Sequence, residues 1–287
     1  MRVLKFGRNY TLTVETLNGE LLIIQPPFTV EFDITRNILT SANVCSIRIY
    51  NLSQNNRNKI RFNIMDTGDF RAVQLQAGYG TNLPIIFNGN ITQAWSVREG
   101  NNFITAIESF DGGFAFSNSQ SNIVFPAGTA QQTVIETLAG SLPNVSIGAI
   151  GSYPGSLSRG ASYNGSATDI LRDLTGGGFF IDNGKANCLG DSECLEGEML
   201  LINSSNGLLG TPVREQTIIN FDMIFEPRLI VGQQIQLQSS TAQNFNGFYK
   251  VISLKHRGTI SQAVCGDAIT SVGMFYGTSA LSTVPAA

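Results

Sequence analysis

The chain has 287 residues, of which 42% are hydrophobic and only 14% are charged. That length is enough for a sizeable core and for two or three compact units. The formal net charge is −3 and no run of lysine and arginine occurs, which disfavours a protein that grips nucleic-acid phosphates. Few charges together with many small polar residues are typical of an all-β protein with large subunit contacts.

The sequence carries no signal for membrane insertion or secretion. No stretch approaches the roughly 20 apolar residues that a membrane helix needs. Two early positive charges, Arg2 and Lys5, have no apolar segment behind them because Gly7-Arg8-Asn9 interrupts it. We therefore expect no membrane segment and no signal peptide. The triplets Asn90-Ile91-Thr92 and Asn164-Gly165-Ser166 then have no glycosylation context.

The first part of the chain has the alternation of β-strands. Apolar and polar residues alternate over residues 29–34, 46–52 and 72–80, so each of these segments is a predicted strand with one buried face. Between the last two, Ser53 is a candidate N-cap for a short helix that passes through Ile60.

The middle of the chain combines helices with strands. The segment 129–140 is a predicted helix, and Gly140 suits the position just after a helix end. A second predicted helix spans residues 166–174, with Ser166 as its N-cap. A strand and a turn follow over residues 179–185. This mixture predicts one or two small α/β units.

From Glu215 onward the strand pattern returns. Gly232 opens a run in which Ile235 and Leu237 face away from the intervening glutamines. Asn246-Gly247 predicts a tight type I′ hairpin with positive φ before the next strand. A β-branched residue at Gly247 is therefore expected to disrupt this part of the protein.

These patterns together predict a mainly β fold with α/β insertions. Two β-barrel domains, residues 1–117 and 211–287, are expected to flank a small α+β middle region at residues 118–210. No tandem repeat with a short fixed period occurs, although the two barrels could be distant structural copies.

The order of the motifs at both ends resembles a known family. The C-terminal part carries them in residues 225–237, 246–251, 254–258 and 266–267, and the N-terminal part in residues 86–92, 98–100 and 107–113. This arrangement is similar to that of phage baseplate (tail) hub proteins and of related spike proteins in contractile secretion machines. The short helix between strands in the first part is also typical of the hub family.

The resemblance implies a structural function and a set of partners. A hub of this kind is a homotrimer whose two barrels per chain form a pseudo-sixfold ring, which adapts a sixfold tail tube to a threefold spike. The implied partners are the tube protein, the spike or needle, other baseplate proteins and the tape-measure protein. DNA would pass through the channel without specific binding, and the protein would lie in the virion at the distal end of the tail, after synthesis in the host cytoplasm.

The cysteines and the single histidine form no pattern of a metal site. Cys45 and Cys265 are expected to be buried small apolar residues, whereas Cys188 and Cys194 frame a loop. Free thiols are the favoured interpretation of that pair, and a disulfide stays open. His256 is expected at a strand end or turn, because no nucleophile or orienting acid accompanies it.

Other polar clusters also lack a catalytic pattern. Gly176–Gly178 follows a helix, and Gly184-Lys185 precedes alanine, so neither is a phosphate loop. Glu193, Glu196 and Glu198 are expected to form a solvated loop and not a glycosidase pair. We therefore expect no enzyme, no catalytic residue, no cofactor-binding residue and no metal ligand.

One alternative from another functional class depends on the aromatic residues. Trp95 or aromatic loop residues could form a carbohydrate platform of a distal-tail or tail-tip host-binding protein. Against this, core packing is expected for a set of phenylalanines in strand patterns: Phe103, Phe110, Phe114 and Phe116. An enzyme is the third and least favoured interpretation.

Overall fold

The computed structural model describes residues 5–38, 42–61, 70–262, 266–275 and 281–286. Strands hold 54% of the residues and helices 14%, which confirms the prediction of a mainly β protein. Within these described residues the largest sheet has 14 strands, and two small sheets lie in the middle of the chain.

The elements fall into three successive groups along the chain. The first comprises β1 (Arg8–Glu15), β2 (Leu21–Ile24), β3 (Val30–Asn37), β4 (Val44–Tyr50), α1 (Gln54–Ile60), β5 (Ala72–Tyr79), β6 (Ile85–Glu99) and β7 (Asn102–Phe110). The second comprises α2 (Gly113–Asn118), β8 (Gln120–Phe125), α3 (Gln131–Gly140), β9 (Ser146–Ile150), β10 (Ala161–Ser166), α4 (Ala167–Leu174), β11 (Phe179–Asp182) and β12 (Lys185–Cys188). The third comprises β13 (Glu193–Ile202), η1 (Ser204–Asn206), β14 (Leu208–Glu215), β15 (Ile218–Ile224), β16 (Gln233–Leu237), η2 (Gln243–Phe245), β17 (Gly247–Ile260), β18 (Ala268–Phe275) and β19 (Ser282–Val284).

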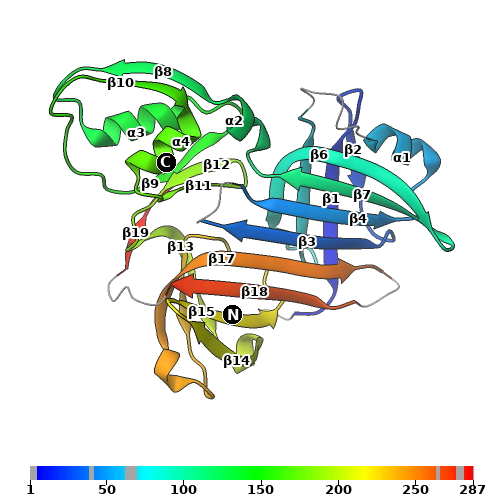
Figure 1. The fold of residues 1–287 in the computed structure, drawn as a ribbon. Coiled ribbons are helices and arrows are strands. Elements are labelled where there is room, and N and C mark those ends of the chain that lie inside the picture. The colour runs from blue at the N-terminus through cyan, green and yellow to red at the C-terminus, as the bar shows by residue number, and fades with distance from the viewer. Residues whose placement is uncertain (1–4, 39–41, 62–69, 263–265, 276–280, 287) are drawn as a thin grey trace.

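One sheet joins the first and third groups. Its strand order is β14-β15-β18-β17-β3-β4-β7-β6-β5-β1-β2, and β13, β16 and β19 branch from it. Figure 1 shows eight of these strands from β6 at the top to β14 at the bottom. The joint is the antiparallel pair β17–β3, which runs from Ser253 opposite Asn37 to Ile260 opposite Val30.

The first and third groups repeat the same strand topology. The hairpin β3–β4 corresponds to β14–β15, and the series β5-β6-β7 corresponds to β16-β17-β18. In both groups the second hairpin strand pairs with the last strand of the series, as β4–β7 and β15–β18. The long strands β6 and β17 each pair first with the preceding strand and then with the following one. Near the start of this second ladder the register shifts, between Ile91 and Gln93 in β6 and between Val251 and Ser253 in β17. The two groups are therefore structural copies of one strand arrangement.

Each copy packs around its own hydrophobic cluster. In β3 the side chains of Val30, Phe32 and Ile34 point inward and are buried, as predicted. They belong to a cluster formed mainly by β1 to β7, to which the third group adds Phe225 and Ile260. Ile235, Leu237 and their neighbours belong to a second cluster in the third group. Within the described part of the chain the strand ladder does not close into a barrel around either cluster.

The predicted helices are confirmed, with one correction. Ser53 caps α1 by accepting a hydrogen bond from the Asn56 amide at 3.3 Å. Ser166 caps α4 in the same way, from the Asp169 amide. Gly140 is the last residue of α3 and not the residue after it; Ser141, with φ −85°, ends this helix. No left-handed glycine is needed there because Ser141 tightens the last turn within ordinary helical backbone angles.

The second group forms a separate α/β unit with its own core. Helices α3 and α4 pack with β8–β10 and with the small sheet β11-β12-β9. Asn183-Gly184 forms the two-residue turn between β11 and β12, with φ of 52° and 74°. These angles are those of a type I′ hairpin, so the turn predicted at residues 182–185 is confirmed.

The type I′ hairpin predicted at Asn246-Gly247 is wrong. Strands β16 and β17 are joined by a longer loop that contains η2, and Asn246 is extended at φ −69°, ψ 132°. The Asn246 side chain instead accepts a hydrogen bond from the Ser239 amide at 2.7 Å. A Cβ at Gly247 would make only ordinary contacts, 3.5 Å from Tyr249. The disruptive effect expected for a β-branched residue at Gly247 is therefore not supported.

Candidate assembly surfaces

The main sheet presents a polar face on the side opposite to its two hydrophobic clusters. Strand alternation places every second residue of β3, β4, β15, β17 and β18 on this face. The charged members on β3, β4, β7, β15 and β17 are Glu31, Asp33, Arg48, Glu108, Asp222, Lys255 and Arg257. We call this surface the polar wall. Its acidic residues outnumber its basic ones.

Acidic neighbours pair two of the basic side chains of the polar wall. Lys255 Nζ lies 2.9 Å from Asp33 Oδ2 on the adjacent strand. Arg48 Nη2 lies 3.0 Å from Glu99 Oε1, and Arg48 Nε lies 3.9 Å from Glu31 Oε2. Because these pairs are exposed, each adds little stability. Their consequence is electrostatic, since a paired cation attracts phosphate less strongly.

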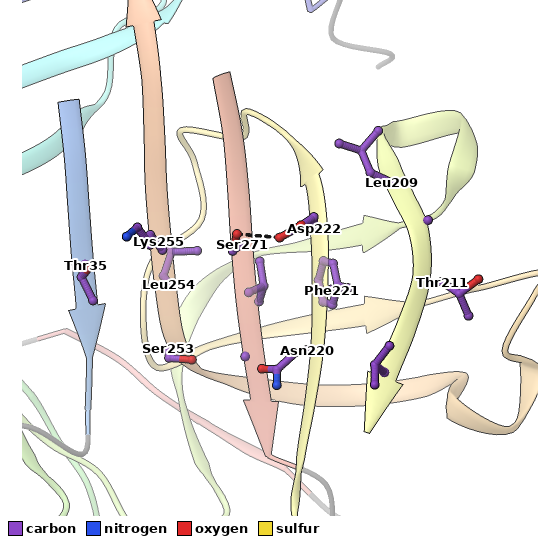
Figure 2. Close-up of a pocket in the computed structure, with 14 residues that line it drawn as sticks. Thr35, Leu209, Thr211, Asn220, Phe221, Asp222, Ser253, Leu254, Lys255 and Ser271 are labelled. Carbon is purple, nitrogen blue, oxygen red and sulfur yellow. Dashed lines mark hydrogen bonds between the residues drawn. The ribbon is translucent and has the colours of Figure 1, made fainter. Parts of the chain in front are cut away.

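A shallow hollow lies where β14 curves away from β15 (Figure 2). Its lining mixes polar residues such as Asn220 and Lys255 with apolar ones such as Leu254, and Ser271 donates a hydrogen bond to Asp222 within it. Gly273 keeps the floor low, because a Cβ at this position would overlap Ser253 Oγ. Leu209 and Thr211 line the side of the hollow that β14 forms. Nothing in this residue set forms a nucleophile–base arrangement.

Two strand edges of the polar wall have no backbone partner within the described residues. One is β14, which pairs only with β15. The other is the distal part of β6, residues 92–99, which pairs with β7 on one side only. Both edges expose apolar side chains: Val213 is 56% exposed, Val97 42% and Trp95 39%. Unpaired apolar edges favour association with another strand.

A buried polar junction joins all three groups of elements. Arg36 on β3, 1% exposed, binds both carboxylate oxygens of Asp182 on β11, at 2.8 and 3.2 Å. Arg36 also donates to the Leu229 carbonyl in the third group, at 3.4 Å. Asn43 donates to the Ile181 carbonyl at 2.9 Å and to Asp182. No local pattern in the sequence indicates this junction, because its members lie far apart in the chain.

Asp111 extends the junction from the end of β7. Its carboxylate accepts hydrogen bonds from the amides of Asn183 and Gly184 in the type I′ turn. Burial and the nearby negative charge of Asp182 raise the pKa of Asp111 to about 7. The backbone hydrogen bonds and the Arg36 guanidinium lower this pKa, but by less than burial and Asp182 raise it.

The raised pKa of Asp111 predicts an unusual pH dependence of stability. An unfolded aspartate has a pKa near 3.9, so between about pH 4 and 7 the folded state holds this proton more tightly than the unfolded state. We expect this group to make the protein more stable as the pH falls from about 7 to about 4. Urea denaturation of Asp111→Asn over this range should lack that contribution. An identical pH profile for both proteins would contradict the assignment.

His256 lies inside β17 and not at a strand end or turn, so that prediction is wrong. The side chain is fully buried, and its Nδ1 lies 2.9 Å from Thr270 Oγ1. Its ring packs edge-on against Phe225, with centroids 5.5 Å apart. Burial and the positive charge of Arg36 lower the pKa of His256 to about 3, so the imidazole is neutral. It is part of the core at the β17–β3 joint.

The solvated loop predicted at Glu193, Glu196 and Glu198 is wrong, because all three residues lie in strand β13. Glu193 accepts hydrogen bonds from the amides of Ser152 and Gly190, each at 2.8 Å. Glu198 pairs with Arg228, which also binds the buried Glu226 at 2.9 Å. Burial would raise the pKa of Glu226, but the hydrogen bond from Arg228 and the charge of Lys5 lower it overall. Glu196, in contrast, is exposed.

The described cysteines are free thiols. Cys45, Cys188 and Cys194 are all buried, and burial raises the pKa of Cys188 to about 12 and of Cys194 to about 11. Such thiols are poor nucleophiles. Cys265 lies outside the described residues. Among the residues described, no group of three or more histidine, cysteine or acidic side chains could hold a metal ion, and no helix is long and apolar enough to cross a membrane.

Two of the phenylalanines assigned to the core lie on the surface. Phe103 is 40% exposed and Phe110 41%. The guanidinium of Arg57 lies 3.9 Å from the Phe103 ring centroid, so this ring serves a cation–π contact. Phe114 is half-buried and packs edge-on against Phe70, with centroids 5.0 Å apart. Phe116 is also half-buried. Strand alternation could not identify these outward positions because both faces carry apolar residues near β7.

This fold also occurs in phage tail proteins. The 43 kDa tail protein of prophage MuSo2 from Shewanella oneidensis matches with a TM-score of 0.62 and 8% identity, over 94% of this chain and 97% of that chain. A tail protein from Neisseria meningitidis MC58 gives 0.62 and 9%, over the same shares of the two chains. The Escherichia coli c3393 protein, a component of the type VI secretion system, gives 0.61 and 11% over 96% and 79%. At such identities these likenesses establish the fold alone.

The sequence itself defines the family. The family model for baseplate hub gp41 matches residues 10–259, so the chain belongs to this family of phage baseplate hub proteins. Membership makes it a structural type of tail protein and implies a location in the virion tail. No curated protein sequence matches this chain.

Proposed function

We propose that this protein is the hub of a phage baseplate, in which three copies form a pseudo-sixfold ring between the tail tube and the spike. The hub lies at the distal end of the tail and contributes part of the channel through which DNA leaves. Each chain supplies two open barrels, within residues 1–117 and 211–287, and a middle unit at 118–210. The protein is structural and catalyses no reaction.

The observation that carries this proposal is the repeated topology of the two end groups. A chain with two copies of one strand arrangement gives six copies when three chains close around an axis. The pair β17–β3 already joins the two copies edge to edge within one chain. Repeating such a joint between chains removes the exposed strand edges, which otherwise invite uncontrolled association.

The polar wall is the proposed lining of the channel. It extends continuously over the eight strands from β14 to β6. The ion pairs of Lys255 with Asp33 and of Arg48 with Glu31 and Glu99 lower its attraction for phosphate. A wall with excess acidic residues lets DNA slide without being held.

The size and shape of the purified assembly test this function. Light scattering after size exclusion should give a trimer, alone or with the spike, and electron microscopy should show six similar lobes around one axis. In isolated tails the ring should occur once, between tube and spike. A monomer that binds glycans would favour the host-binding alternative, and copies along the whole tube would contradict the hub assignment.

Removing the acidic partners in the polar wall should create DNA binding. The triple variant Glu31→Gln, Asp33→Asn and Glu99→Gln leaves Arg48 and Lys255 without their ion-pair partners. We expect the parent trimer not to retain duplex DNA at 150 mM salt and the variant to retain it, with an affinity that falls steeply as salt increases. A filter-binding titration measures both. Equal retention by the two proteins would contradict the proposed lining.

A further inference from the structure

The repeated topology also indicates how two neighbouring chains would meet, provided that the proposed trimer forms. Strand β3 in the first group corresponds to β14 in the third, and β17 corresponds to β6. Within the chain, β17 pairs with β3. The equivalent pair is therefore β6 with β14. These two strands lie at opposite ends of the eight-strand wall in Figure 1 and cannot meet within one chain.

We propose that the distal part of β6 pairs antiparallel with β14 of the next copy, with Val97 directly opposite Val213. The occupant of each open edge is thus a second copy of this chain. Both edges expose apolar residues, and both strands are long enough, because β14 has 8 residues and β6 has 15.

The register follows from residues that lie directly opposite one another across the strands. In the first group one such row consists of Asp33, Ser46, Glu108 and Gln93. In the third group the corresponding row consists of Val213, Asn220, Gly273 and Ser253. Both rows end at the first paired residue after the irregularity in the long strand, Gln93 in β6 and Ser253 in β17. Asp33 therefore corresponds to Val213, and Gln93 to Ser253.

The joint inside the chain then gives the contact between copies. Arg257 lies four residues after Ser253 and is opposite Asp33. Four residues after Gln93 comes Val97, which is therefore opposite Val213 of the next copy. The β17–β3 joint within the chain therefore has a charged pair, Arg257 and Asp33, where the joint between chains has an apolar pair, Val97 and Val213. Cross-strand apolar pairs stabilise a sheet, and burying both valines removes apolar surface from water.

Cysteine cross-linking tests the register. Directly opposed residues have Cβ atoms about 4.5–5.5 Å apart, which is close to the distance that a disulfide needs. In a Cys265→Ser background, mild oxidation of Val97→Cys with Val213→Cys should convert most chains to a covalent trimer on a non-reducing gel. The control pairs Val97→Cys with Leu209→Cys, four residues along β14 and roughly 10 Å or more away, and should remain largely monomeric on the same gel.

The outcomes separate this inference from the proposed function. If light scattering shows a trimer but the Val97–Val213 pair does not cross-link, or the control cross-links better, the register is wrong while the trimer stands. If the unmodified protein is monomeric at every concentration, both the register and the proposed trimer are wrong.

A second test avoids oxidation. Val97→Lys should reduce trimer formation at least tenfold, and adding Val213→Glu should restore most of it. Lack of restoration in folded protein would also overturn the register.

Discussion

Replacing Arg36 by methionine is expected to destabilise the protein by about 3–5 kcal/mol, the usual cost of breaking a buried ion pair by removing one partner. The substitution removes two hydrogen bonds to Asp182 and one to the Leu229 carbonyl. It also leaves the carboxylate of Asp182 buried beside Asp111 without the guanidinium that neutralises it. Urea denaturation followed by fluorescence or circular dichroism measures the change.

Two variants show whether the effect comes from the unpaired buried charge. Arg36→Met combined with Asp182→Leu removes both charges and should recover most of the lost stability, because a buried ion pair often equals an apolar pair of similar volume. Arg48→Met breaks a pair whose arginine side chain is 41% exposed and should cost less than about 1 kcal/mol. If Arg36→Met costs no more than Arg48→Met, the junction does not hold the three groups together.

Local sequence patterns predicted the elements that depend on neighbouring residues. The cap at Ser53, the cap at Ser166 and the inward face of β3 each follow from spacings of a few residues, and the structure has all three. The Asn183-Gly184 turn follows from the positive φ that these two residues tolerate. The motif order also led to the correct family.

Contacts between distant segments could not be predicted in this way. Arg36 and Asp182 are 146 residues apart, and no local signal in either strand indicates a buried partner. For His256 the sequence predicts a strand end or turn, because no nucleophile or orienting acid accompanies it in the chain. Lys255 and Arg257, the residues on either side of it in β17, lie on the polar wall, whereas His256 faces the core. The pairing of β17 with β3 decides this, and that pairing is a property of the whole sheet.

The local sequence also fails to indicate which glycines are crowded by distant segments. Gly89 and Gly247 have similar sequence surroundings, but a side chain is expected to destabilise the protein at only one of them. Gly89 on β6 and Gly247 on β17 both follow an asparagine in strand-like sequence. A Cβ at Gly89 would lie 2.5 Å from the Phe110 carbonyl oxygen and 2.9 Å from its carbon, which are backbone atoms of β7's last residue. A Cβ at Gly247 would approach only the Tyr249 ring, at an ordinary 3.5 Å.

We therefore expect Gly89→Ala to destabilise the protein by about 3 kcal/mol, because overpacking against backbone atoms forces β6 and β7 apart. Gly247→Ala should change stability by less than about 1 kcal/mol, since its backbone needs no positive φ and nothing crowds the new methyl group. Urea midpoints of the two variants against the parent measure both effects.

The same two variants should differ in assembly. Because β6 carries the edge proposed to meet the next chain, Gly89→Ala should also weaken the trimer, whereas Gly247→Ala should leave it intact. Equal losses in the two variants would mean that Gly89 has no special place beside β7, and a severe loss in Gly247→Ala would restore the tight hairpin that the sequence alone suggests.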